Sequence, residues 1–211
     1  MSAVATVIGD LVASRTTSDR ARVHEAFADH IEVINREWQP VTPLRITVGD
    51  EFQGAFETVG AAIQAAFRLR IALAPLVDIR HGIGWGETSV LRDDPRVEDG
   101  EGWWVARAAI ETAEDAASKA ASRSVRTWYQ PAEGAGGPDP AAINAALLSR
   151  DELFSRLDLS SVSVLSGMLS AMSQKAIAAE LDITPSAVSQ RIRRDGIAVI
   201  VRADELMGDV R

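Results

Sequence analysis

The chain has 211 residues, of which 46% are hydrophobic and 25% are charged, and its formal net charge is −8. That length accommodates one domain of about 150 residues and a second, smaller one. The acidic balance argues against nucleic-acid binding by the whole surface, and the lack of cysteine excludes disulfides, thiol catalysis and cysteine-bound metals. No apolar run could span a membrane and no signal-like segment opens the chain, so we expect a cytoplasmic protein with no membrane partner.

The first 130 residues alternate between strand and helix patterns. Runs with period 2 predict strands, runs with apolar residues three and four apart predict helices, and Gly and Pro mark the breaks between them. The predicted strands cover residues 3–12, 44–48, 51–56, 77–90 and 124–129, and the predicted helices cover 21–38, 59–74 and 103–122. Residues 92–101 are polar and acidic, which predicts a loop.

This order is that of a ferredoxin-like βαββαβ unit with one further helix and strand. We therefore predict an α+β domain over residues 1–130. Residues 131–142 are rich in Gly, Pro and Ala and predict a linker. The pattern is helical from 143 to 211, which predicts a small all-α domain.

Two Gly-Asp pairs stand at the ends of predicted strands. Asp10 closes the first strand, and Asp50 lies with Glu51 in the segment VGDEFQGAF. If the two strands are neighbours, Asp10 and Asp50 could share a divalent cation such as Mg²⁺, which prefers carboxylate oxygens. The alternative is ordinary turn chemistry, in which Gly and Asp serve the backbone only.

Glycine occupies every second position of the strand that contains Gly82, Gly84 and Gly86. One face of this strand therefore exposes bare backbone, and something bulky must lie against it. A packed helix or a neighbouring sheet would fill that role, and so would a ligand base or a second subunit.

Four segments in order, IGDLVASR, VGDEFQGAF, IRHGIGWGE and DGEGWWVARAAIE, resemble the class III nucleotidyl cyclase catalytic domain, and more closely the SatD-like bacterial proteins. The resemblance implies that Asp10 and Asp50 bind metal. It also implies that Arg107 stabilises charge on the phosphates of a purine nucleotide triphosphate, and is a catalytic residue if the protein is active. The loop expected to receive the triphosphate consists of Leu11, Val12, Ala13 and Ser14.

One position departs from that pattern. Trp103 stands four residues before Arg107, where a cyclase has Asn, and an indole cannot orient a ribose hydroxyl as an amide does. The departure favours retained nucleotide binding over 3′,5′-cyclisation.

Residues 173–195 have the pattern of a helix-turn-helix. A first helix is followed by a short turn and by a second helix that opens on Pro185, a favoured first position. The second helix would direct polar side chains outward to phosphates and base edges. These candidate DNA-binding residues are Ser186, Ser189, Gln190, Arg193 and Arg194. A helical hairpin used for dimer packing or for a protein contact is the alternative.

Three functional hypotheses follow. The first is a homodimeric regulator that binds double-stranded DNA and whose cyclase-like domain binds a purine nucleotide, with or without Mg²⁺. The second is an active Mg²⁺-dependent nucleotidyl cyclase, or a related nucleotide-processing enzyme, with a helix-turn-helix that targets it. The third is a fold used only for dimerisation.

Overall fold

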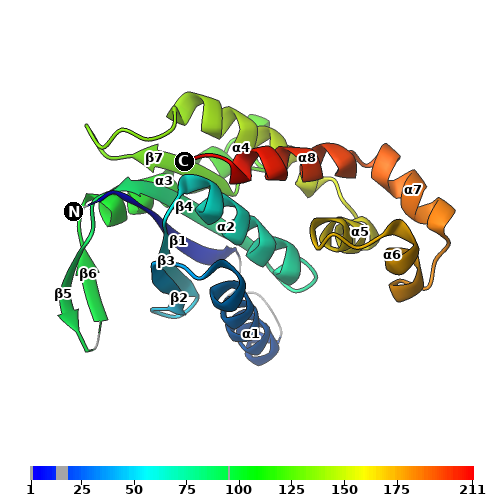
Figure 1. Ribbon diagram of the computed structural model, residues 1–211, viewed down its shortest axis with the longest axis horizontal. Coiled ribbons are helices and arrows are strands. Elements are labelled where there is room, and N and C mark those ends of the chain that lie inside the picture. The colour runs from blue at the N-terminus through cyan, green and yellow to red at the C-terminus, as the bar shows by residue number, and fades with distance from the viewer. Residues whose placement is uncertain (1, 13–18, 95) are drawn as a thin grey trace.

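A five-stranded sheet is the centre of the computed structural model, which describes residues 2–12, 19–94 and 96–211 (Figure 1). Its strand order is β2-β3-β1-β4-β7. The strands are β1 (Val4–Val12), β2 (Thr42–Ile46), β3 (Glu51–Phe56), β4 (Asp78–Gly86) and β7 (Thr127–Pro131). Neighbours are antiparallel, except that β7 runs parallel to β4.

The order β2-β3-β1-β4 is that of the ferredoxin-like unit, and β7 is the appended strand. The predicted α+β fold is therefore confirmed. One local prediction is wrong: residues 92–101 are not simply a loop, because β5 (Ser89–Asp93) and β6 (Arg96–Asp99) pair as a separate two-stranded ribbon. Glu98 on this ribbon accepts hydrogen bonds from Thr42 and Arg45 of β2, so side chains distant in sequence anchor it.

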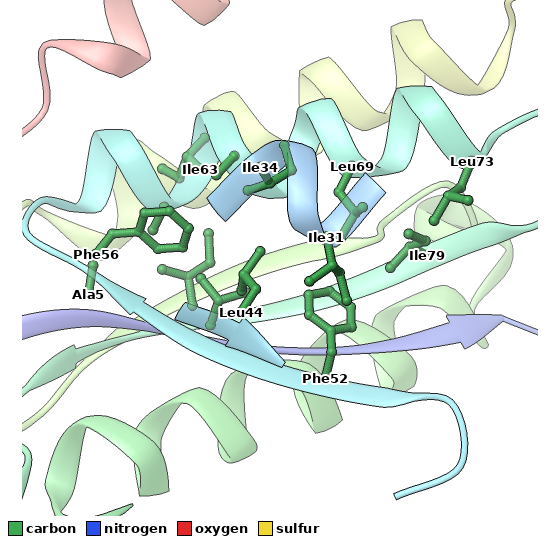
Figure 2. Close-up of a cluster of buried hydrophobic side chains, with 14 of the residues drawn as sticks. Ala5, Ile31, Ile34, Leu44, Phe52, Phe56, Ile63, Leu69, Leu73 and Ile79 are labelled. Carbon is green, nitrogen blue, oxygen red and sulfur yellow. The ribbon is translucent and has the colours of Figure 1, made fainter. Parts of the chain in front are cut away.

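Helices α1 (Arg20–Trp38) and α2 (Val59–Leu73) cover one face of the sheet. Figure 2 shows the apolar side chains between them, with Phe52 and Phe56 of the sheet directed toward Ile31, Ile63 and Leu69 of the helices. Phe52 and Phe56 are almost completely buried. This layer is the main core and holds β1 and β3 in place.

Helix α3 (Glu101–Ala117) covers the opposite face and explains the alternating glycines. A Cβ built on Gly82 would lie 2.2 Å from the Ala106 carbonyl oxygen, and one on Gly84 would lie 2.3 Å from that of Gly102. The bulky neighbour of this bare strand face is thus a packed helix, the first of the alternatives above. The helix is shorter than predicted, because a 3₁₀ turn at Ala120–Ser122 follows it.

Five helices follow the sheet: α4 (Pro140–Ser155), α5 (Leu159–Leu169), α6 (Gln174–Glu180), α7 (Pro185–Arg194) and α8 (Ile197–Gly208). Figure 1 shows α8 lying along α2, while α5, α6 and α7 gather at one end of the molecule. Side chains from α4 and α8, such as Leu147 and Met207, belong to the core of the sheet domain. Phe67 and Ile71 of α2 belong instead to the core of α5–α8, so α2 is shared by both parts.

None of the helices in the described ranges combines the length and the apolar character that crossing a bilayer requires.

Candidate functional site

Acidic and basic side chains from β1, β3, β4 and α3 meet at one end of the sheet, on the face that α3 covers. Asp10 lies opposite Glu51 of β3 on one side and opposite Arg80 of β4 on the other. Two carboxylates directly opposite each other on neighbouring strands repel one another. Arginines compensate: Arg80 binds Asp10 (Nη1 to Oδ2, 3.2 Å) and Glu114 of α3 (3.0 Å).

Asp10 is held in an environment that disfavours its charge. Burial raises the pKa of Asp10, Arg80 opposes this, and the charges of Glu114, Asp50 and Glu51 raise it further. Its Oδ1 atom is buried and has no hydrogen-bond partner among the described residues. An oxygen with an open lone pair in a field of carboxylates is a place where a cation would be stabilised.

Arg107 lies beside this cluster and makes a two-pronged ion pair with Glu51 (3.2 and 2.9 Å). The hydrogen bonds that Arg107 donates to Glu51 raise the pKa of Arg107 above its ordinary value. Glu51 is therefore an acceptor for Arg107 in this structure. Trp103, one helical turn earlier, is buried with Ile8 and Ala55 in a small apolar cluster.

The residues present fit a Mg²⁺ ion bound mainly by its substrate. The described residues contain no group of three or more His, Asp and Glu side chains that could hold a metal. Mg²⁺ is commonly bound through one or two carboxylates together with phosphate oxygens and water. Asp10 has an open buried oxygen, and Asp50 is near enough for its charge to act on Asp10. These two would hold the ion, which would neutralise phosphate charge when bound.

The predicted triphosphate loop is described only in part. Leu11 lies in β1 and its side chain is buried in the core under α1 and α2, so only its backbone could reach a phosphate. Val12 ends the strand and is half-buried. Ala13 and Ser14 lie outside the described residues.

Helices α6 and α7 form the predicted helix-turn-helix. Ser173 caps α6 by accepting from the Ala176 amide, and Thr184 caps α7 by accepting from the Ala187 amide. Asp182 in the turn adopts a left-handed backbone conformation, with φ of 52°. Inward side chains Val188 and Ile192 are buried, and they fix which face of α7 points to solvent.

Four of the candidate DNA-binding residues on α7 are exposed, namely Ser186, Gln190, Arg193 and Arg194, and Ser189 is half-buried. The arginines of this helix are not equivalent. Arg194 is paired with Asp195 (2.6 Å), and Arg191 donates to Asp158 and to Ser161 of α5 (2.9 Å each). Arg193 makes no ion pair within the described chain, so it is the cation best placed to meet an external anion.

Sequence reasoning missed Arg80 and Glu114 and left the partner of Glu51 open. A signal for Arg80 exists: it alternates with Ile79 in a strand, so it must point to the face opposite the main core, as Asp10 does. Glu114 offers no such signal, because its contact with Arg80 depends on how α3 crosses the sheet.

The fold is similar to that of solved nucleotidyl cyclases. One is a bacterial light-regulated adenylyl cyclase, with a TM-score of 0.45 and 13% identity over 54% of this chain and 40% of that chain. Another is the guanylyl cyclase domain of the RhoGC fusion protein from the aquatic fungus Blastocladiella emersonii, with a TM-score of 0.42 and 17% identity over 53% and 75% of the two chains.

A third structure aligns over nearly the whole chain. It is a regulator of polyketide synthase expression from Bifidobacterium adolescentis, with a TM-score of 0.30 and 16% identity over 99% of this chain and 86% of that one. No curated protein sequence matches the chain.

The protein is an α+β domain with a mixed five-stranded sheet, followed by C-terminal helices. The chain belongs to the SatD family, whose model matches residues 4–210.

Proposed function

We propose that this protein is a homodimeric, DNA-binding transcription regulator whose cyclase-like domain binds a purine nucleotide. The observation that carries the proposal is the helix-turn-helix of α6 and α7. Both of its helices are capped, its inner face is buried, and its outer face is polar with Arg193 at its C-terminal end. Such a helix is suited to the major groove, where polar side chains read base edges and arginines contact phosphates.

The nucleotide part of the proposal is supported by the cluster around Asp10. An open buried carboxylate oxygen and a surface arginine lie near each other at one end of the sheet. A Mg²⁺–triphosphate would be bound through Asp10 and Asp50, and its phosphates would compete with Glu51 for the Arg107 guanidinium.

A homodimer would supply the second DNA half-site. A single helix-turn-helix offers few base contacts, whereas a two-fold dimer places two recognition helices about one helical turn of DNA apart, or a multiple of it. Nucleotide binding could then change the spacing of the two recognition helices, because α2 packs both on the sheet and on α5–α8.

The test is selection of bound sequences from a random duplex library by the full chain, followed by affinity measurements with and without ATP or GTP and Mg²⁺. We expect one enriched motif with two-fold symmetry, and an affinity that changes with the nucleotide in the wild type but not in Asp10→Asn. Recovery of no motif, with binding that is equal on all sequences, would refute the regulator.

The alternative is an active nucleotidyl cyclase, and Arg107 beside Asp10 is the observation that favours it. Trp103 opposes it, because its side chain is packed in an apolar cluster and replaces the expected amide. Incubation with ATP or GTP and Mg²⁺, followed by chromatography, separates the two: a cyclic product supports the enzyme, and unchanged nucleotide supports the sensor.

A further inference from the structure

We propose that a cavity between the sheet domain and α5 binds a small amphipathic anion, which carries a carboxylate or phosphate head on an apolar body. The cavity has a volume of about 420 Å³. Its walls come from the C-terminal half of α2, the start of β4, the connection before β7, the end of α4 and the start of α5. It contains none of the residues assigned to nucleotide or DNA, and the inference does not depend on either function.

One wall of the cavity is cationic although the chain as a whole is acidic. Arg70, Arg123 and Arg126 line it, with Asp78 as the one acidic residue. Both oxygens of Asp78 are already used, since one accepts from Arg70 (2.8 Å) and the other from Arg126 (2.7 Å). Arg70 is also paired with Asp151, which does not line the cavity, whereas Arg123 has no ion pair within the described residues, so the lining keeps an excess of positive charge.

Two of these arginines have donors left for a ligand. Arg126 uses its Nε for Asp78 and its Nη1 for the carbonyls of Arg123 and Val125, and within the described chain no hydrogen bond uses its Nη2. Arg123 is exposed. The nearby Glu152, which does not line this cavity, is paired with Arg156 (2.9 Å). A guanidinium pair of this kind suits a carboxylate or phosphate head.

A second wall is apolar and adjoins the first, since the Arg70 guanidinium lies over the Phe154 ring (4.7 Å). It consists of side chains from α4, α5 and the segment between them, chiefly Phe154, Leu157, Leu159 and Val162. Pockets for small ligands are commonly 300–1,000 Å³ in size, roughly, with mostly apolar walls and a few placed polar groups. An inorganic anion would leave this wall unused, so the occupant we infer has an apolar body as well as a charged head.

The experiment is isothermal titration of the full chain with octanoate and octyl phosphate, each compared with its short counterpart, acetate or inorganic phosphate. The two long probes distinguish a carboxylate from a phosphate head. We expect at least one of them to bind, and its short counterpart to bind at least about tenfold more weakly. Excess ATP with Mg²⁺ should not displace the probe.

Two variants with matched controls test whether the probe binds in this cavity. Arg123→Glu should weaken binding about tenfold or more, while Arg202→Glu, on an exposed part of α8, should leave it unchanged. Leu159→Gln should weaken it about threefold, and Leu206→Gln should not, although both leucines are more than half exposed. Arg123 and Leu159 are surface positions, so these variants should fold.

The proposal is overturned if neither long probe binds at millimolar concentration, if acetate or phosphate binds as tightly as its long counterpart, or if Arg123→Glu and Arg202→Glu behave alike. Displacement of the probe by ATP with Mg²⁺ would assign it to the cluster around Asp10 and would overturn the proposal equally.

Discussion

His81 is a titratable side chain whose place in the structure explains why it is not a catalytic base. It is completely buried, and neither ring nitrogen has a hydrogen-bond partner among the described residues. Its ring packs edge-to-face with that of Phe52, with 5.8 Å between the ring centroids. Burial lowers the pKa of His81 from 6.5 to about 3, with a further contribution from Arg70 and Arg150. The folded protein thus keeps His81 neutral.

The lowered pKa of His81 makes the stability of the fold depend on pH. Below pH 6.5 the unfolded chain binds a proton at His81 that the folded chain does not bind until about pH 3, so stability is lost as the pH falls through that window. Between pH 7.5 and pH 5 the loss from this group should be about 2 kcal/mol. Urea unfolding of the wild type and of His81→Leu at both pH values would measure it. His81→Leu should lose less free energy of unfolding over this pH range than the wild type does. The control is His24→Gln, at an exposed site on α1, which should behave as the wild type. Equal pH slopes in His81→Leu and the wild type would contradict this account.

Arg193 gives the second prediction at this scale. Arg191 and Arg194 are occupied by Asp158 and Asp195, so Arg193 should provide the phosphate contact of α7. Arg193→Ala should weaken binding to the selected duplex about fivefold or more and reduce the slope of log affinity against log salt by about 1 for each protomer. Fluorescence anisotropy across a salt series measures both. Arg202→Ala is the control, and an affinity equal to that of the control would show that α7 does not contact DNA.

At the scale of elements, the contact between β4 and α3 fixes the cluster around Asp10. The glycines of β4 let α3 approach so closely that its backbone lies where a Cβ would be. Arg107 and Glu114 reach Glu51 and Arg80 because of this approach. The glycines therefore position the site without contributing side chains to it, whereas Arg80, on the same face of β4, belongs to the site.

Gly84→Ala tests this contact. The added methyl carbon would lie 2.3 Å from the Gly102 oxygen and 2.7 Å from the Ala106 nitrogen, which are backbone atoms that cannot move alone. Overpacking of this kind costs about 1–3 kcal/mol. Gly102→Ala, where the nearest atom lies 3.1 Å away, should cost clearly less. Thermal unfolding of both variants would measure the two losses of stability. A larger loss in Gly102→Ala than in Gly84→Ala would show that α3 can shift freely.

Much of the element pattern could be predicted from sequence because it depends on local rules. Alternation and proline breaks located the strands of the sheet, and the capping residues Ser173 and Thr184 stand where the helix-turn-helix pattern needs them. The β5–β6 ribbon could not be predicted in this way, since Glu98 is held by Thr42 and Arg45 from a distant strand. The pairing of Arg107 with Glu51 has the same origin: strand register and helix crossing bring together residues that no short segment relates.

At the scale of the whole molecule, α2 joins the two parts of the chain. Its residues are buried on nearly every side, with Ile63 and Leu69 in the core of the sheet and Phe67 and Ile71 in that of α5–α8. A buried polar junction fixes α2 to α4 and β7. Asp151 of α4 accepts from the backbone amides of Arg126 and Thr127 at the start of β7 (2.7 and 2.9 Å), and it is paired with Arg70 of α2 (2.9 Å).

Because the two parts share α2, we expect the chain to unfold as one unit. All five tryptophans lie between residues 38 and 128, so their fluorescence reports on the sheet domain, whereas ellipticity at 222 nm includes the helices of both parts. The two signals should give the same denaturation midpoint.

Asp151→Asn removes the negative charge between Arg70 and Arg150, which are both buried, and an uncompensated buried charge costs about 3–5 kcal/mol. Both midpoints should therefore fall together, by roughly 10 °C in thermal unfolding, while Glu152→Gln at the neighbouring exposed position leaves them unchanged. Midpoints that separate, in the wild type or in Asp151→Asn, would mean that the helices fold independently of the sheet, and α2 could then not carry a signal from nucleotide to DNA.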